Sequence, residues 1–78
     1  MANVKVFSTQ TCPYCDMLKS FLSTHNVDFQ DIDVSTDYNS AMEMVRVSGQ
    51  RGVPVSLIDG QVVVGFDQHR IRELLNLK

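Results

Sequence analysis

The residues that follow the first strand-like segment constrain the fold most, because the spacing of apolar side chains changes there from alternating to helical. Residues 3–7 (NVKVF) alternate between apolar and polar side chains, which predicts a strand. Pro13–His25 carries an apolar helical face made of Tyr14, Leu18, Phe21, Leu22 and His25. Pro13 suits the first helical turn, and Asn26 suits a left-handed end to the helix. The chain therefore begins with a strand and a helix, and its two cysteines, Cys12 and Cys15, lie at the junction.

The middle of the chain predicts a second strand and a second helix. Val27–Val34 alternates between apolar and polar side chains, as a half-buried strand does. Ser35–Asp37 offers N-cap residues, and Gly49 suits the end of the helix that follows. The expected apolar stripe of this helix is Tyr38, Ala41, Met42 and Val45. Gln50–Val53 then reads as a turn.

The last part of the chain predicts a β-hairpin and a third helix. Two short β-rich segments, Pro54–Ile58 and Gln61–Val64, are joined by Asp59-Gly60, a strong signal for a tight hairpin turn. Gly65 ends the hairpin, and Asp67 suits the N-cap of the helix. Phe66 and Ile71 occupy the positions of a hydrophobic staple, and the inward residues are Ile71, Leu74 and Leu75.

This order of elements, β-α-β-α-β-β-α, predicts one small α/β domain over residues 1–78. The first two strands should be parallel with a right-handed crossover, and the last two should be antiparallel. We expect a four-stranded mixed sheet flanked by three helices on its two faces. Met17, Met42 and Met44 are expected to fill or border the core.

Charge and hydropathy exclude several classes of function. The net charge of -2 and the pI near 5.4 argue against a nucleic-acid partner, which calls for a basic face. No apolar run reaches the roughly 18 residues of a membrane span. The first residues, MANVKVF, lack the features of a signal peptide. We therefore expect a cytoplasmic monomer, in a compartment where cysteines are usually reduced, metal-bound or catalytic.

The cysteine pair has three possible roles, and two of them fit poorly. A Cys12–Cys15 disulfide closes a very short loop, so it constrains the unfolded chain little. A zinc site needs about four ligands, and the further candidates His25 and His69 lack a zinc-binding spacing. Redox chemistry remains, because a C-x-x-C at a strand-to-helix junction is its usual signature. Unpaired N–H groups at the helix start favour a thiolate on Cys12, and Cys15 lies one turn further on.

Three motifs resemble the glutaredoxin branch of the thioredoxin fold. They are TCPYC at residues 11–15, GVP at Gly52–Pro54 and VGFD at Val64–Asp67, and the match in element order covers essentially the whole chain. The resemblance implies a cis Val53–Pro54 bond close to the cysteines. It also implies that Cys12 is the nucleophile and Cys15 the resolving thiol, with Pro13, Tyr14 and Pro54 supporting the active site.

The resemblance further implies substrates and a reductant. The substrates would be disulfide-bonded or glutathionylated proteins, and glutathione would be the co-substrate, with no tightly bound cofactor and no metal. The expected glutathione-binding residues are Thr9, Tyr14, Arg51, Val53, Pro54, Gly65, Phe66 and Asp67. Gln50 and Lys19 are additional candidates. Arg51 could equally be a solvated surface residue, and for Lys19 we favour that interpretation.

The sequence departs from the glutaredoxin pattern around the cysteines. Thr9 stands where the family usually has a lysine, and Asp16 and Met17 follow Cys15 where a basic residue is common. A double glycine is reduced to Val64-Gly65. The residues at positions 9, 16 and 17 leave less positive charge near Cys12 than the family pattern has. We therefore expect the pKa of Cys12 to be lowered, but less than it would be with a lysine at position 9.

Three alternatives stay open from sequence alone. The GFD turn also resembles small redoxins that thioredoxin reductase reduces and that donate electrons to ribonucleotide reductase. An iron–sulfur carrier would use Cys12 together with glutathione, although Pro13 disfavours that role in the family. A non-catalytic module would hold an extended peptide between Tyr14, Val53 and Phe66. For Phe66 we favour the staple with Ile71 over a role in binding, and for His69 and Asp67 a surface and a capping role.

Overall fold

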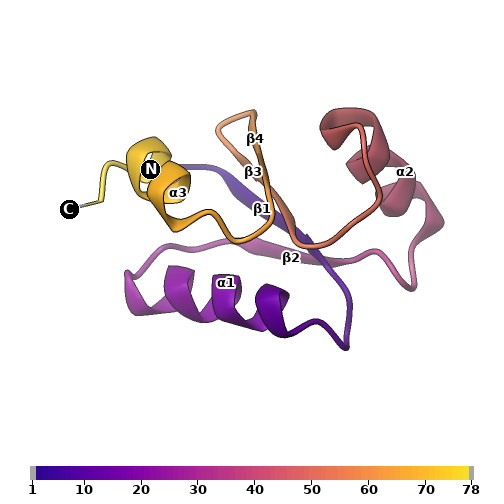
Figure 1. Cartoon of the computed structure of the whole chain (residues 1–78), viewed down its shortest axis with the longest axis horizontal. Coiled ribbons are helices and arrows are strands. Elements are labelled where there is room, and N and C mark those ends of the chain that lie inside the picture. The colour runs from indigo at the N-terminus through magenta and orange to yellow at the C-terminus, as the bar shows by residue number, and fades with distance from the viewer. Residues whose placement is uncertain (1, 78) are drawn as a thin grey trace.

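The computed structural model describes residues 2–77, and its elements follow the expected order (Figure 1). They are β1 (Val4–Ser8), α1 (Pro13–Thr24), β2 (Gln30–Asp33), α2 (Tyr38–Ser48), β3 (Val55–Ile58), β4 (Gln61–Val64) and α3 (Gln68–Leu75). None of the helices in this part of the chain is long and apolar enough to cross a membrane.

The four strands form one mixed sheet in the order β2-β1-β3-β4. β1 pairs in parallel with β2 and antiparallel with β3, and β3 and β4 form the hairpin. The predicted α/β thioredoxin-like architecture is therefore confirmed. The second strand is shorter than the predicted Val27–Val34, because the Val27 N–H donates to Leu22 O at the end of α1 and is not available to the sheet.

Two apolar clusters cover the two faces of the sheet. One joins α1 and α3 to the sheet and contains Val4, Val6, Leu18, Leu22, Ile58, Val63 and Ile71. The other lies beneath α2 and contains Phe7, Met44 and Val55. Figure 1 shows α1 running along one side of the sheet, with α2 set apart from α1 and α3. The helices thus cover both faces, as expected.

The inward face of α2 differs from the predicted stripe. Tyr38 and Met42 are exposed, whereas Met44 is buried against Phe7 and Val55. Met17 on α1 is also exposed, so the expectation that Met17 and Met42 belong to the core is wrong, and only Met44 fulfils it. Apolar side chains occupy two adjacent stripes of α2, and packing against the sheet selects the one that includes Met44.

The predicted helix caps and turns are confirmed. Asp37 and Asp67 accept hydrogen bonds from backbone N–H groups in the first turns of α2 and α3. Gly49 ends α2 at φ 72°. Asp59 and Gly60 both have positive φ, of 50° and 83°, as a tight hairpin turn between twisted strands requires.

Candidate active site

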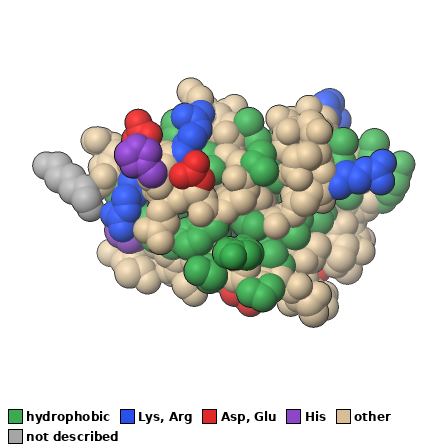
Figure 2. Space-filling view, viewed as in Figure 1, with side chains coloured by type: hydrophobic (Ala, Val, Ile, Leu, Met, Phe, Trp, Pro, Cys, Tyr) green, Lys and Arg blue, Asp and Glu red, His purple; other side chains and the backbone are tan. Residues whose placement is uncertain are grey.

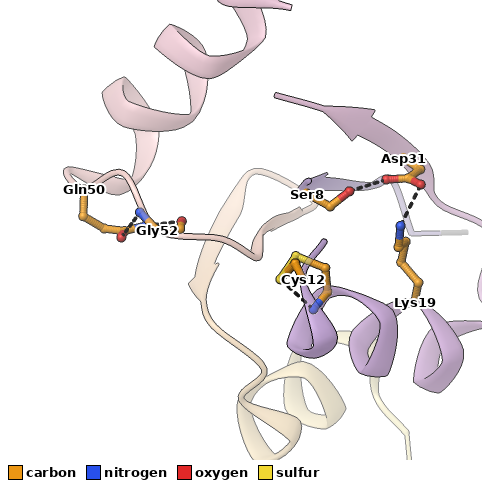
Figure 3. The surroundings of a disulfide bond; sticks show 7 residues. Ser8, Cys12, Lys19, Asp31, Gln50 and Gly52 are labelled. Carbon is orange, nitrogen blue, oxygen red and sulfur yellow. Dashed lines mark hydrogen bonds and ion pairs between the residues drawn. A yellow bond between two sulfur atoms is a disulfide. The ribbon is translucent and has the colours of Figure 1, made fainter. Parts of the chain in front are cut away.

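Cys12 and Cys15 form a disulfide at the start of α1 (Figure 3). Cys12 is the N-cap, with extended backbone angles (φ −139°, ψ 101°), and Pro13 follows in the first turn. Because α1 begins here, Cys15 lies one turn along, and the two Cα atoms are 5.2 Å apart. The structure therefore brings the two predicted redox residues together.

The two sulfur atoms lie in different surroundings. Cys12 is 9% exposed, whereas Cys15 is completely buried. The Cys15 N–H donates to Cys12 Sγ at 3.1 Å, so a backbone dipole points at this sulfur. Hydrogen bonds to the charged form of a group lower its pKa. In the reduced protein we expect the same N–H to favour a thiolate on Cys12.

A second loop approaches the end of the sheet where α1 begins. β1 leads into the cysteines, and Val55, at the start of β3, pairs with Phe7 near the end of β1. The Val53–Pro54 bond just before β3 is cis, as predicted, and Pro54 is buried. The topology thus places this cis-proline at the same end of the sheet as Cys12.

The turn after the hairpin joins this loop. The Gly65 N–H donates to Pro54 O at 2.8 Å, so residues 53–54 and 65 lie side by side. Phe66 packs against the cluster that contains Ile71, and its ring lies edge-on to Phe21 at 5.8 Å. Asp67 accepts a hydrogen bond from the Arg70 N–H at 3.2 Å. Phe66 and Asp67 therefore have structural contacts of their own in addition to any role in binding.

Gln50 forms hydrogen bonds within the loop that precedes the cis-proline. Its side-chain amide contacts both the N–H and the carbonyl of Gly52 (Figure 3). The neighbouring Arg51 is exposed. Gln50 and Arg51 were both predicted as candidates for ligand binding. They differ in availability, because the side-chain polar atoms of Gln50 already form hydrogen bonds within the loop.

A hydrogen-bonded chain beside the cysteines was missed by sequence reasoning. Ser8 Oγ donates to one carboxylate oxygen of Asp31 at 2.8 Å, and Lys19 Nζ lies 3.0 Å from the other (Figure 3). These groups join β1, β2 and α1. The sequence signal that could have indicated these contacts is the predicted parallel pairing of the first two strands, because it places α1 over them. Lys19 has a structural partner and is not an unpaired cation.

The loop before Cys12 is fastened to the end of β2. Gln10 Nε2 donates to Asp33 Oδ2 at 3.1 Å, while Asp33 Oδ1 accepts hydrogen bonds from the hydroxyl and N–H of Ser35. The Ser35 hydroxyl is the main cause that holds the pKa of Asp33 below its usual value. Thr9 lies in the same loop and is partly buried. The Asp33 carboxylate therefore links the loop before Cys12 to the end of β2.

The outer surface of α1 near the cysteines carries two exposed apolar side chains. Tyr14 is 63% exposed and Met17 is 49% exposed, and they lie three residues apart on the helix. Asp16 between them is also exposed. Figure 2 shows hydrophobic side chains gathered near the centre of one face, with charged side chains towards its left and right edges. Of the two predictions for Tyr14, burial is excluded and a contact with substrate stays a prediction.

The described residues contain no group of three or more His, Cys, Asp or Glu side chains placed to hold a metal ion.

Cys12 and Cys15 lie near a buried proline, backbone hydrogen-bonding groups and exposed apolar side chains. Such a pair can exchange a disulfide with another thiol by way of a mixed disulfide.

Comparisons with known proteins agree with this chemistry. The family model described as glutaredoxin matches residues 4–63. A glutaredoxin-like 8.6 kDa protein of the rubredoxin operon in Clostridium pasteurianum is 43% identical over 72 residues, which cover 92% of this chain and 96% of that protein. Glutaredoxin 3 of Escherichia coli K12 is 39% identical over 67 residues, covering 86% and 81%.

Solved structures show the same architecture. The crystal structure of a point mutant of the thioredoxin-like protein BC3987 has a TM-score of 0.92 and 31% identity, and the match covers 100% of both chains. A buckwheat glutaredoxin in complex with glutathione has a TM-score of 0.79 and 26% identity, covering 96% of this chain and 74% of that one.

Proposed function

Because the chain belongs to the glutaredoxin family, we propose that it reduces protein disulfides and glutathione mixed disulfides through reversible oxidation of Cys12 and Cys15. The observation that carries this proposal is the asymmetry of the pair. Cys12 is the N-cap of α1, keeps 9% of its surface accessible and accepts an N–H, whereas Cys15, one turn behind it, is completely buried. One sulfur can therefore meet a substrate, and the other can reach only its neighbour.

In the proposed reaction, the Cys12 thiolate attacks one sulfur of the substrate disulfide. The bond between the substrate sulfurs breaks, and the leaving thiolate takes up a proton. Cys15 then attacks Cys12 Sγ, releases the second substrate thiol and forms the intramolecular disulfide present in the structure. Two electrons have passed from the pair to the substrate, and a reductant must return them.

The surroundings of Cys12 support its role as the attacking sulfur. The start of a helix and a donated N–H both stabilise negative charge, so the pKa of Cys12 should lie below the ordinary thiol value of about 8.5. Asp16 opposes this effect, because a nearby negative charge disfavours a second one. We expect a moderately lowered pKa.

Glutathione is the proposed co-substrate. The Val53 backbone beside the cis-proline and the exposed Arg51 would hold it from one side, and Gly65 and the Asp67 backbone from the other. The complete proposed set also includes Thr9, Tyr14, Pro54 and Phe66. The buckwheat relative, solved with glutathione, supports this assignment because its fold covers nearly all of this chain.

A second candidate has the same chemistry but receives its electrons from thioredoxin reductase. Lys19 is paired with Asp31, and apolar Tyr14 and Met17 border the cysteines, so little positive charge is offered to glutathione on α1. The similarity to BC3987, which is described as thioredoxin-like, also favours this reductant.

A coupled assay separates the two reductants. A disulfide substrate is supplied with NADPH and either glutathione plus glutathione reductase or thioredoxin reductase alone, and the consumption of NADPH is measured. We expect turnover with glutathione and none with the Cys12→Ser variant. Turnover only with thioredoxin reductase would select the second candidate, and turnover with neither would contradict a disulfide reductase.

A further inference from the structure

Ser56 has a fully buried side chain, and its hydroxyl is the one buried side-chain polar atom in residues 2–77 with no hydrogen-bond partner. Buried hydroxyl groups are nearly always hydrogen-bonded, so an exception calls for an explanation. The mechanism described above does not use this residue.

The register of the sheet shows which face Ser56 occupies. Ser56 lies opposite Val6 on β1 and Val63 on β4, and both valines belong to the cluster beneath α1 and α3. Ile58, two residues further along β3, belongs to the same cluster. Since alternate residues of a strand share a face, Ser56 points toward the side that α1 covers.

The direction of α1 shows which of its residues lie near Ser56. β1 and β2 are parallel, so α1 must run back along β1, and it begins at the end of the sheet where Val55 lies. Pro54, Ser56 and Ile58 follow one another away from that end, at about 6.6 Å per two residues. The buried residues of α1 follow the same course as Cys15, Leu18 and Leu22, at about 1.5 Å per residue. With Pro54 taken as level with Cys12 at that end of the sheet, Ser56 lies about 6.6 Å further on, between Cys15 at about 4.5 Å and Leu18 at about 9 Å along α1.

Cys15 is the polarisable group at that level, and it changes with the redox state. In the disulfide its sulfur is bonded to Cys12 and is turned toward it. Reduction breaks this bond, consumes two electrons and two protons, and leaves two thiols. The Cys15 sulfur is then no longer held by Cys12, and its S–H becomes a second buried polar group.

We propose that the Ser56 hydroxyl is the hydrogen-bond partner of Cys15 Sγ in the reduced protein and positions this sulfur for the resolving step. The proposal rests on the redox cycle proposed above. The hydroxyl accepts from the thiol, or donates to the thiolate when Cys15 attacks the mixed disulfide. It has no partner in the oxidised state and gains one on reduction, so it favours the reduced pair.

The test is the equilibrium of the pair in buffers of reduced and oxidised dithiothreitol, which require no glutathione site. The fractions of thiol and disulfide are read by alkylation and mass spectrometry. Ser56→Ala should shift the equilibrium toward the disulfide about three- to tenfold, and tenfold corresponds to about 30 mV for two electrons. Ser56→Val should behave in the same way, whereas Ser56→Thr, which has the shape of valine but keeps the hydroxyl, should stay near the wild type.

A kinetic measurement supplies the second readout. The rate at which Cys15 resolves a mixed disulfide on Cys12 should rise with pH in all variants, but at higher pH in Ser56→Ala and Ser56→Val, because a lost donor raises the pKa of Cys15. Circular dichroism checks that each variant is folded.

The outcomes are distinguishable. If the wild type cycles but the alanine and valine variants share its equilibrium and its pH profile, Ser56 is only a buried hydroxyl and the inference is wrong. If threonine and valine shift the equilibrium equally, side-chain volume and not the hydroxyl is responsible, which also overturns it. If the wild-type pair does not cycle in any buffer, the proposed function fails first.

Discussion

Cys12 and Cys15 show how one helical turn can give two identical side chains different surroundings. The N-cap position leaves Cys12 9% accessible and directs the Cys15 N–H toward its sulfur, while the next turn buries Cys15 completely. The residues around Cys12 then set how strongly a thiolate is favoured. Met17 is a departure from the glutaredoxin pattern that a single substitution can reverse with little disturbance, because its side chain is exposed.

Met17→Lys should lower the pKa of Cys12 and the KM for a glutathionylated substrate. A cation on α1 attracts both the thiolate and a glutathione carboxylate, and the expected change in KM is about two- to fivefold, as an exposed ion pair contributes. The measurements are a thiol titration and steady-state kinetics at low salt. Met42→Lys is the matched control, since Met42 is 46% exposed on α2 against 49% for Met17 on α1. Equal effects of the two substitutions would show that only net charge matters.

The elements themselves followed closely from the sequence where local signals were strong. The Asp59-Gly60 turn, the caps Asp37 and Asp67 and the helix end at Gly49 all act within a few residues, so a pattern of residue types is enough to predict them. The inward face of α2 could not be predicted, because it depends on which apolar stripe meets Phe7 and Val55.

The same distinction holds for the active site. The Cys12–Cys15 pair is local and was predicted, whereas the chain from Ser8 through Asp31 to Lys19 depends on the register between strands. Ser56 gave no signal in the sequence, since its lack of a partner appears only after the sheet and α1 are assembled.

Two carboxylates at the ends of secondary-structure elements, Asp33 of β2 and Asp37 at the N-cap of α2, should make the stability of the fold sensitive to acid. The pKa values of Asp33 and Asp37 are held below the usual 3.8, chiefly by the hydroxyls of Ser35 and Ser40. A pKa that is lower in the folded state stabilises the fold above the unfolded pKa, and this contribution is lost as pH falls through the folded value. The free energy of unfolding should therefore decline below about pH 4.

Urea unfolding between pH 5 and pH 2 checks this expectation. Asp33→Asn and Asp37→Asn should each make the decline shallower, because an amide keeps an acceptor oxygen but cannot be protonated in this range. Asp28→Asn removes the same charge from another exposed aspartate and serves as the control. A decline unchanged in all three variants would mean that other carboxylates are responsible.

The whole molecule places the active site at one end of a thin sheet whose two faces are both covered. The cysteine loop, the cis-proline loop and the turn at Gly65 come from distant parts of the sequence, and the order β2-β1-β3-β4 brings them to the same end. In so small a chain, the packing of α1 on the sheet should govern both stability and the position of the cysteines.

Leu22→Ala should therefore lower the free energy of unfolding by about 2–5 kcal/mol, since Leu22 is fully buried between α1 and the sheet. Met42→Ala on the exposed face of α2 should change it by about 0.5 kcal/mol or less. Urea denaturation of the oxidised proteins measures both. Similar values for the two variants would mean that the α1 cluster does not dominate the stability.

The central claim, that Cys12 attacks and Cys15 resolves, is tested most directly by trapping the mixed disulfide. Reduced Cys15→Ser and reduced Cys12→Ser are each mixed with glutathione disulfide, and the adduct is timed and located by mass spectrometry of peptides. The account predicts that Cys15→Ser rapidly accumulates one glutathione on Cys12, whereas Cys12→Ser reacts far more slowly at the buried Cys15. Equal rates for the two variants, or faster reaction at Cys15, would contradict it.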